Sequence, residues 1–461
     1  MTDEDRGAPP ESPKQMTRRT LDSLAWSSSG ALVQTVLQFG VLLVLARLLT
    51  PADFGVVGAA TLVLGFSQVF WQLGVGPAII QRPTIAREHV ETAFTSSVVL
   101  GLVFATGMFF LAPVIAEFFR IPRLTSVLRV STAIYLVRGG ILVAESLLRR
   151  ELHFKQIAII QFSAYVAYGV VSITAAALGA GVWALVTGYI AQSLTEAILV
   201  LKSQPHSKRL HVHRSALREM LSFGSGITAA QIANYCALQG DNFVVGRLLG
   251  ARSLGIYGRS YNLMAMPANL FASAVDTVLF PAMSRVQSEP QRLAAAFRRA
   301  VALTALVALP LSAITYVLAP EVVDVLLGEQ WGGVVPVLRI LALGIFFRTA
   351  YKLGASVARA KGKVHQIAWR QGAYGATVIG GAWIAGSAFG LRGVAWAVLA
   401  SLGLIFVLLM HLALRVTGVS ARDLLGLHLP PLVLSALILG VSQGAATLAR
   451  SAEVPSFLIL V

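Results

Sequence analysis

Two pairs of charged residues stand inside long apolar stretches of this chain, where a charge needs a partner or a ligand. Arg138 and Glu145 are seven residues apart, which places them two turns apart on one face of a helix. Arg348 and Lys352 are four apart and are therefore neighbours on one face. Two adjacent cations repel each other unless an anion lies between them. The first pair predicts an internal ion pair or a polar cavity; the second predicts an anion site or side chains that reach the membrane surface.

Carboxylates in apolar stretches are candidates for coupling to an ion, because a low dielectric raises the proton affinity of the group. Asp241, Asp276 and Glu145 are the residues of this kind. A salt bridge from an aspartate to Arg259 or Arg247 is the structural alternative, and we favour it.

Amide side chains form two i,i+4 pairs in the first two apolar stretches. These pairs are Gln34 with Gln38 and Gln68 with Gln72, and each shares a helix face. Such amide rows can bind sugar hydroxyls or hold neighbouring helices together, and both interpretations stay open.

Other polar residues have simpler interpretations. His206, His211 and His213 match no usual zinc spacing and lie among Lys and Arg, so we expect a solvated linker and neither metal nor cofactor. Arg47 and Arg247 stand beside turns at equivalent places in the chain, which predicts a structural role. Arg370 is expected to anchor a helix end at the membrane interface.

The elements that hold these residues must be membrane helices. Of 461 residues, 56% are hydrophobic and 13% are charged, with a mean hydropathy of +0.73, whereas soluble proteins carry about 25% charged residues. The net charge of +16 does not indicate nucleic-acid binding, because the Lys and Arg residues are spread over short loops. The single Cys236 lies in an apolar stretch, so there is no disulfide framework.

Apolar runs of about 20 residues can each cross a bilayer as a helix. The predicted spans are Trp26–Leu49, Gly55–Ile80, Thr92–Ala116, Ser126–Leu148, Ile157–Gly179, Gly181–Leu201, Leu221–Gly250, Ile256–Met283, Ala300–Ala319, Val334–Ala358, Ile367–Phe389, Gly393–Leu414 and Leu429–Ala449. The remaining Pro455–Val461 is too short to span, as if the chain ended inside a further helix. The polar N-terminus has no cleavable signal peptide, so the first span is expected to direct insertion.

Loop charges predict the orientation. The tail and the loops on its side hold 24 Lys and Arg residues, while the opposite loops hold 9. Because cytoplasmic loops are enriched in Lys and Arg, the N-terminus and the basic connection Lys202–Glu219 are predicted to be cytoplasmic.

The two halves of the chain repeat. Arg47-Leu48-Leu49 with Gly55 and Gly58 recurs 200 residues later as Arg247-Leu248-Leu249 with Gly255 and Gly258, and Gln156-Ile157-Ala158 recurs 210 residues later as Gln366-Ile367-Ala368. Gly181-Val182-Trp183-Ala184 is similar to Gly393-Val394-Ala395-Trp396-Ala397. Six spans therefore repeat as six, which predicts a parallel repeat with its axis along the membrane normal.

Three motifs carry a family resemblance. They are Ala46–Gly55, with the sequence ARLLTPADFG, Leu279–Arg285, with LFPAMSR, and Leu326–Trp331, with LLGEQW. The chain resembles the polysaccharide exporters of the multidrug/oligosaccharidyl-lipid/polysaccharide superfamily, and within them the Wzx flippases of the colanic-acid-exporter type.

This resemblance implies an all-α polytopic protein of the bacterial inner membrane, with two six-helix lobes around a central cavity that opens alternately to either side. It implies export of an undecaprenyl-diphosphate-linked oligosaccharide for exopolysaccharide or lipopolysaccharide, with membrane lipids, a polysaccharide polymerase and assembly proteins as partners. The segments are then a disordered cytoplasmic tail, 1–22; an N-terminal lobe, 23–201; a basic linker, 202–219; a C-terminal lobe, 220–415; and one or two further helices, 416–461.

A charged cargo needs such a cavity, since each charge at the bilayer centre costs about 2.5–3.5 kcal/mol. Arg138, Arg348 and Lys352 are the predicted ligands of the diphosphate, and the four Gln residues are the predicted ligands of the sugars. A lipid II flippase or a drug/cation antiporter of the same superfamily is an alternative, although an antiporter should have an acidic cavity. A membrane glycosyltransferase or polymerase needs a large catalytic loop. Lys202–Glu219 is too short for one, so we expect no enzyme.

Overall fold

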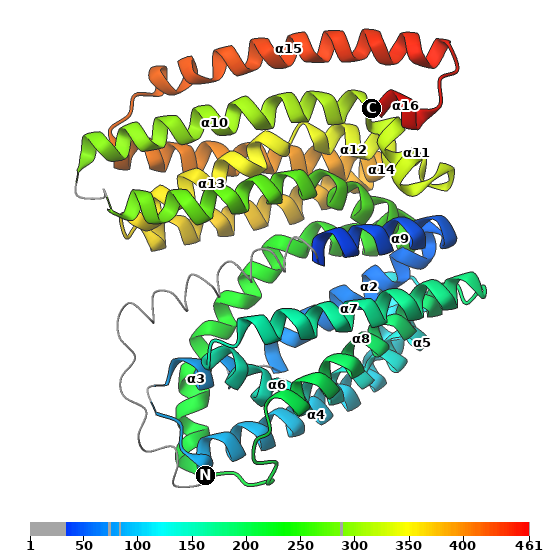
Figure 1. The fold of residues 1–461 in the computed structure, drawn as a ribbon, viewed down its shortest axis with the longest axis vertical. Helices are drawn as coiled ribbons and strands as arrows, with labels where there is room; N and C mark the ends of the chain where they lie inside the picture. The colour runs from blue at the N-terminus through cyan, green and yellow to red at the C-terminus, as the bar shows by residue number, and fades with distance from the viewer. Residues whose placement is uncertain (1–33, 72–74, 83, 286–288, 461) are drawn as a thin grey trace. The chain divides into compact units, whose positions relative to one another are not determined.

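The computed structural model describes residues 34–71, 75–82, 84–285 and 289–460, and every regular element in these ranges is a helix (Figure 1). Within them, eight helices are long and apolar enough to cross a membrane, and the bent pair α12–α13 makes a ninth. The chain is an all-α, multi-pass membrane protein, as its composition predicted. The predicted tail and the start of the first span lie outside the described residues.

The helices follow the predicted spans closely. After a first described helix, Gln34–Leu48, they are α2 (Pro51–Trp71), α3 (Val75–Gln81), α4 (Arg87–Phe119), α5 (Leu124–Ser131), α6 (Ala133–Arg150), α7 (Phe154–Ala177), α8 (Val182–Ser203), α9 (Arg214–Arg285), α10 (Pro290–Val317), α11 (Ala319–Leu327), the 3-10 turn η2 (Glu329–Trp331), α12 (Val334–Ala342), α13 (Ile345–Ala360), α14 (Val364–Thr417), α15 (Ala421–Ser451) and α16 (Ser456–Leu460).

Two glycines divide the longest helices. Gly250 in α9 has φ of +77° and Gly390 in α14 has φ of +61°, a region that glycine enters without steric cost. The helical path is interrupted at each of them. Each long helix therefore contains two of the predicted spans.

The start of α2 is set by its own sequence. Thr50 precedes Pro51, which suits the first helical position because it needs no backbone N–H there. The Thr50 hydroxyl and backbone N–H both donate to Asp53 Oδ2, at 2.6 and 3.1 Å, and the Asp53 N–H donates back to Thr50 Oγ1 at 3.3 Å. This reciprocal pattern is a capping box.

The contacts divide the chain into two compact units. Unit 1 comprises the described residues within Met1–Leu48, Ser67–Ala112 and Ser126–Ala229, and unit 2 comprises those within Leu49–Phe66, Pro113–Thr125 and Ala230–Val461. The predicted lobes, 23–201 and 220–415, follow the order of the chain and remain a prediction.

In unit 1, α8 packs against both α7 and α6. Arg150, in the last turn of α6, donates to the backbone oxygens of Ile79 at 2.9 Å and of Arg82, so its cation caps the C-terminal end of α3. This contact adds to the packing of α3 on α6, which buries Val75, Ala78 and Ile79.

The basic connection after α8 is not simply a solvated linker, and that prediction is wrong in part. The Thr95 hydroxyl donates to the His211 carbonyl at 3.0 Å, and the His213 N–H donates to Thr92 Oγ1 at 3.0 Å. The His206 ring packs edge-on against Phe94, with centroids 5.4 Å apart. Burial lowers the pKa of His206, which favours its neutral form. The first three turns of α4 therefore hold the connection.

In unit 2, α10 packs against α15 and α13 packs against α14, so that the four lie together (Figure 1). Their shared core consists of large apolar residues, among them Leu293, Phe297, Val301, Leu353 and Met410. The helix α11 is tied to the end of α15 by an ion pair between Glu321 and Arg450 at 2.6 Å.

Candidate functional site

Unit 2 contains a partly enclosed pocket of about 260 Å³. Its wall comes from the first turns of α2 and from α9 on both sides of Gly250. The lining residues are Phe54, Gly58, Thr61, Leu62, Tyr235, Leu238, Gln239, Asn242, Leu254, Gly255, Gly258, Arg259, Tyr261 and Asn262. A cavity needs about 10–15 Å³ of this kind of space to hold one water, so the pocket is large enough for a small polar group.

Amides give this pocket its chemistry. The Asn242 Nδ2 donates to Gln239 Oε1 at 3.0 Å, which orients both side chains. Within the described part of the chain, no partner occupies the Gln239 amino group or the Asn262 amide. Tyr235 is fixed by a hydrogen bond of 2.8 Å from its hydroxyl to the Leu62 carbonyl. The pocket therefore offers free donors and acceptors beside aromatic rings.

A charged cluster stands behind one pocket wall. Arg348 Nη1 donates to the hydroxyl of Tyr261, and the guanidinium carbon lies 4.9 Å from the centre of that ring. The Tyr257 hydroxyl donates to Asp241 Oδ2 at 2.7 Å, and the rings of Tyr257 and Tyr261 are 6.1 Å apart. Arg348 Nε is buried and has no hydrogen-bond partner in the described structure. A donor of Arg348 thus remains available.

Asp241 does not form the salt bridge that we favoured from the sequence. Its carboxylate is 3% exposed and accepts hydrogen bonds from Tyr257 and from the backbone and amide of Asn242. Neither Arg259 nor Arg247 is its ion-pair partner: their guanidinium groups lie over the rings of Phe54 and Phe118, at 4.4 and 5.0 Å. Each of the two arginines is stacked on an aromatic ring and not paired with Asp241.

Sequence reasoning missed most of the pocket, although a signal was present. Tyr235, Gln239 and Asn242 recur at i, i+4 and i+7, which puts hydrogen-bonding groups on one face of a helix in a mostly apolar chain. The glycines of the repeat also mark it. Gly58 and Gly258 are equivalent residues, 200 apart, and both line the pocket.

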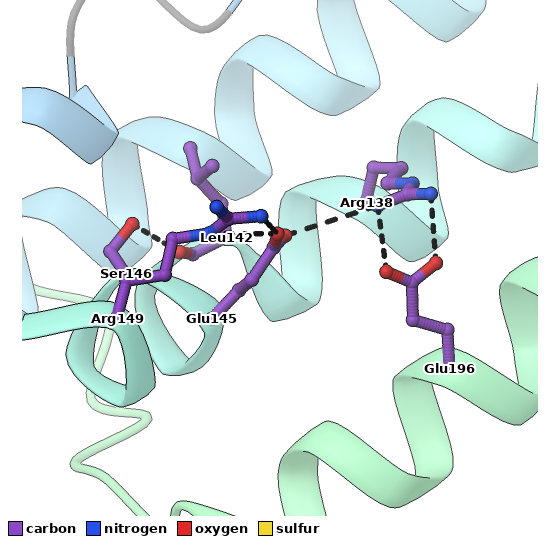
Figure 2. Close-up of polar contacts among 6 residues, drawn as sticks. All are labelled: Arg138, Leu142, Glu145, Ser146, Arg149 and Glu196. Atoms are coloured by element: carbon purple, nitrogen blue, oxygen red, sulfur yellow. Dashed lines mark hydrogen bonds and ion pairs between the residues drawn. The ribbon is translucent and has the colours of Figure 1, made fainter. Parts of the chain in front are cut away.

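In unit 1, Arg138 is held by two acids (Figure 2). Its Nη2 lies 2.8 Å from Glu196 Oε2 and its Nη1 3.2 Å from Glu196 Oε1, so α6 is joined to α8 by a bidentate pair. Glu145 lies further from Arg138, at 3.9 Å, and is bound by Arg149 at 2.8 Å. The predicted Arg138–Glu145 contact exists, but Glu196 is the main partner, and sequence spacing within one helix could not reveal it.

The remaining predicted site residues are spread over the chain. Gln38 and Gln68 are exposed and Gln34 is half-buried, all in unit 1, and Lys352 is half-buried on α13 one turn from Arg348. Gln72 and the Asp276 side chain lie outside what the structure describes. None of the described four lines the pocket of unit 2, and their predicted roles stay untested.

Arg370 is not the surface anchor that we predicted. It is 7% exposed, and its guanidinium donates to the carbonyls of Leu408 at 3.1 Å and Gln366 at 2.6 Å. Leu408 belongs to the segment of α14 that follows Gly390. Arg370 therefore joins the two halves of α14.

A family described as polysaccharide biosynthesis protein matches residues 44–336, well over half of the chain. The chain belongs to this family. Its similarity to lipopolysaccharide biosynthesis protein WzxC of Escherichia coli strain K12 is 24% identity, over 76% of this chain and 71% of that protein. Succinoglycan biosynthesis transport protein ExoT of Rhizobium meliloti strain 1021 is 26% identical, over 70% of this chain and 65% of that protein. The predicted resemblance to polysaccharide exporters is confirmed.

Solved structures share the fold of this polysaccharide biosynthesis family member. The inward closed conformation of the lipid II flippase MurJ has a TM-score of 0.74 at 13% identity, over 94% of this chain and 96% of that one. An inward-facing multidrug resistance MATE transporter has a TM-score of 0.64 at 18% identity, over 84% and 95%. At these identities the likeness establishes the fold.

Proposed function

We propose that this chain moves lipid-linked oligosaccharides from the inner to the outer leaflet of the bacterial cytoplasmic membrane. The observation that carries the proposal is a pocket lined by free amides and tyrosines, in a helical chain of a polysaccharide family. The names of the relatives support it, because WzxC serves lipopolysaccharide biosynthesis and ExoT serves succinoglycan transport. The carrier is taken to be undecaprenyl diphosphate, with polymerase and assembly proteins receiving the product.

The pocket has the chemistry that a sugar needs. A hydroxyl that enters a membrane without a hydrogen bond costs roughly 2–7 kcal/mol, so a sugar can cross only if each hydroxyl finds a donor or an acceptor. The free Gln239 amino group and the Asn262 amide supply both, and the ring of Tyr261 supplies an apolar face beside them. The polyprenyl tail needs no such site, because it stays in lipid.

Among the cations predicted from the sequence to bind the diphosphate, Arg348 is our candidate, because it contacts Tyr261 in the pocket wall. It stands behind Tyr261 and has an uncommitted Nε, and a guanidinium binds phosphate oxygens through two parallel hydrogen bonds. Arg138 is less suited, since Glu196 already engages both of its terminal nitrogens. Asp241 is the candidate for coupling to a proton, because it is buried and both of its hydrogen-bond donors, Tyr257 and Asn242, are neutral.

The structure of MurJ makes lipid II the second candidate cargo. Lipid II also joins a sugar to a polyprenyl diphosphate, so a single pocket chemistry serves either cargo. A drug/cation antiporter fits less well. Among the described residues that line the pocket none is acidic, and a cation needs an acid.

Deletion of the gene, followed by complementation, tests the proposal. The deletion strain should accumulate a polyprenyl-diphosphate-linked oligosaccharide on the cytoplasmic leaflet, where reagents added outside the cell do not reach it. Complementation with the wild-type gene should abolish this accumulation. Gln239→Ala and Asn262→Ala should restore little transport, whereas Gln443→Ala, an exposed amide on α15 away from the pocket, should restore all of it. Normal export without the gene contradicts the proposal. Accumulation of lipid II instead would select the second cargo.

A further inference from the structure

Two helices of unit 2 cross at a pair of glycines that are equivalent in the repeat. A Cβ atom on Gly55 of α2 would lie 1.7 Å from the carbonyl oxygen of Ala251, and one on Gly255 of α9 would lie 1.9 Å from the carbonyl oxygen of Pro51. Pro51 and Ala251 are 200 residues apart, as are Gly55 and Gly255. Each glycine thus lies against the carbonyl of the residue four positions before the other glycine. The contact is therefore reciprocal, as at a two-fold axis.

No side chains interlock at this point of the crossing. The two backbones meet directly, as small residues allow in membrane helices, through weak contacts of the Cα–H to carbonyl kind. Beside it, Gln330 Nε2 donates to the Leu49 carbonyl at 3.1 Å, and the buried Trp331 packs edge-on against Phe54 at 5.4 Å. The motif Leu326–Trp331 thereby holds the start of α2 in place.

The crossing borders one end of the pocket, which Phe54 and Leu254 beside the two glycines also line. Gly255 lines the pocket itself, and the next turns of the two helices continue the wall with Thr61 on α2 and Asn262 on α9. The helix α2 and the segment of α9 after Gly250 start at turns that follow Arg47 and Arg247, on the side that the loop charges predict to be external. The crossing is therefore the end of the pocket nearest to that side.

We propose that the Gly55–Gly255 crossing is the closure of the pocket toward the outside, and that the two helices separate there to release the cargo. This inference rests on the proposed transport function. Atoms added at the crossing should force the helices apart and open the pocket, because both obstacles are backbone carbonyls that cannot rotate away. The same helices supply matched controls one turn further on. A Cβ on Gly58 would meet only the Leu254 side chain, at 3.7 Å, and one on Gly258 would meet nothing within 4 Å.

Thiol labelling in intact cells tests the closure. The reporter is Asn262→Cys in a Cys236→Ser background, reacted with a membrane-impermeant maleimide and normalised to labelling in denaturing detergent. Gly55→Ala and Gly255→Ala should each raise labelling about tenfold, a shift of ~1.4 kcal/mol. Gly58→Ala and Gly258→Ala should leave it at the wild-type level.

Two further measurements keep the result unambiguous. Gln330→Ala adds no atom to the crossing and releases the start of α2, so it should also raise labelling, and it replaces the glycine variants if they fail to insert. Equal labelling in all variants overturns the closure, and so does a rise confined to inside-out vesicles. If labelling rises as expected but the deletion strain exports normally, the closure stands and the proposed cargo is wrong.

Discussion

The guanidinium of Arg138 on α6 and the carboxylate of Glu196 on α8 form an ion pair 2.8 Å long, with 28% and 9% of the side chains exposed. Each charge is largely withdrawn from water, so each depends on the other. The main role of this ion pair, which we call the brace, is therefore structural: it joins α6 to α8 in unit 1.

Removal of one partner from this brace should destabilise the protein. Arg138→Ala leaves Glu196 buried without a counter-charge and should cost roughly 3 kcal/mol of unfolding free energy. Arg138→Ala with Glu196→Ala should regain most of that stability, and transport should return with it. Thermal unfolding in detergent and export assays measure the two effects. If the double variant is stable but inactive, Arg138 contacts the cargo.

The second prediction concerns Arg348. Arg348→Ala should stop export while the protein inserts normally, and Arg348→Lys should recover only part of it, because an ammonium cannot stack on Tyr261 and bind phosphate bidentately. Tyr261→Phe keeps the ring and removes the hydroxyl that accepts from Arg348, so it should cause a smaller loss. Arg359→Ala, an exposed cation of the same helix, is the control. Full export by Arg348→Ala would remove this residue from the site.

The third prediction follows from the ion pair of Glu321 with Arg450. Burial raises the pKa of the Glu321 carboxyl, but hydrogen bonds from Arg450 and the backbone, with the charges of Arg450 and Arg339, outweigh it and leave the pKa below its usual 4.5. A lowered folded-state pKa gives stability that is present above pH 4.5 and is lost as the pH falls through the folded-state value. The melting temperature should therefore change little between about pH 7 and pH 5 and should drop as the pH falls below about 4.5.

A neutral variant should remove this dependence. Glu321→Gln should cost about 2 kcal/mol at pH 7, since it weakens two charge-assisted hydrogen bonds, and should show a flatter pH profile. Glu117→Gln, at an exposed carboxylate, should behave like the wild type. Parallel profiles for all three proteins would contradict the assignment.

The fourth prediction is the orientation of the chain. In a Cys236→Ser background, Lys208→Cys in the basic connection should resist an impermeant thiol reagent in intact cells, and Arg392→Cys should react. Both residues are exposed, so accessibility depends on the side of the membrane and not on burial. Labelling of Lys208→Cys from outside would invert the topology.

The sequence by itself determined the helical, membrane-spanning class of this protein, because hydropathy and length act along the chain and need no knowledge of packing. It also determined the local ends of its helices. Thr50, Pro51 and Asp53 start α2 through contacts within four residues, and Gly250 is the last residue of a predicted span. The family resemblance rested on short motifs of the same local kind.

The tertiary structure decided which polar residues meet. Glu196 is 58 residues from Arg138 and on another helix, so no spacing rule could pair them. The pocket needs α2 beside α9, a contact between residues about 200 apart, and Asp241 has an aromatic partner where charge counting predicted an arginine. Which residues of two helices meet depends on the rotation of each helix about its own axis. Close packing of whole helix faces sets this rotation, and the residue pattern along the chain does not encode it.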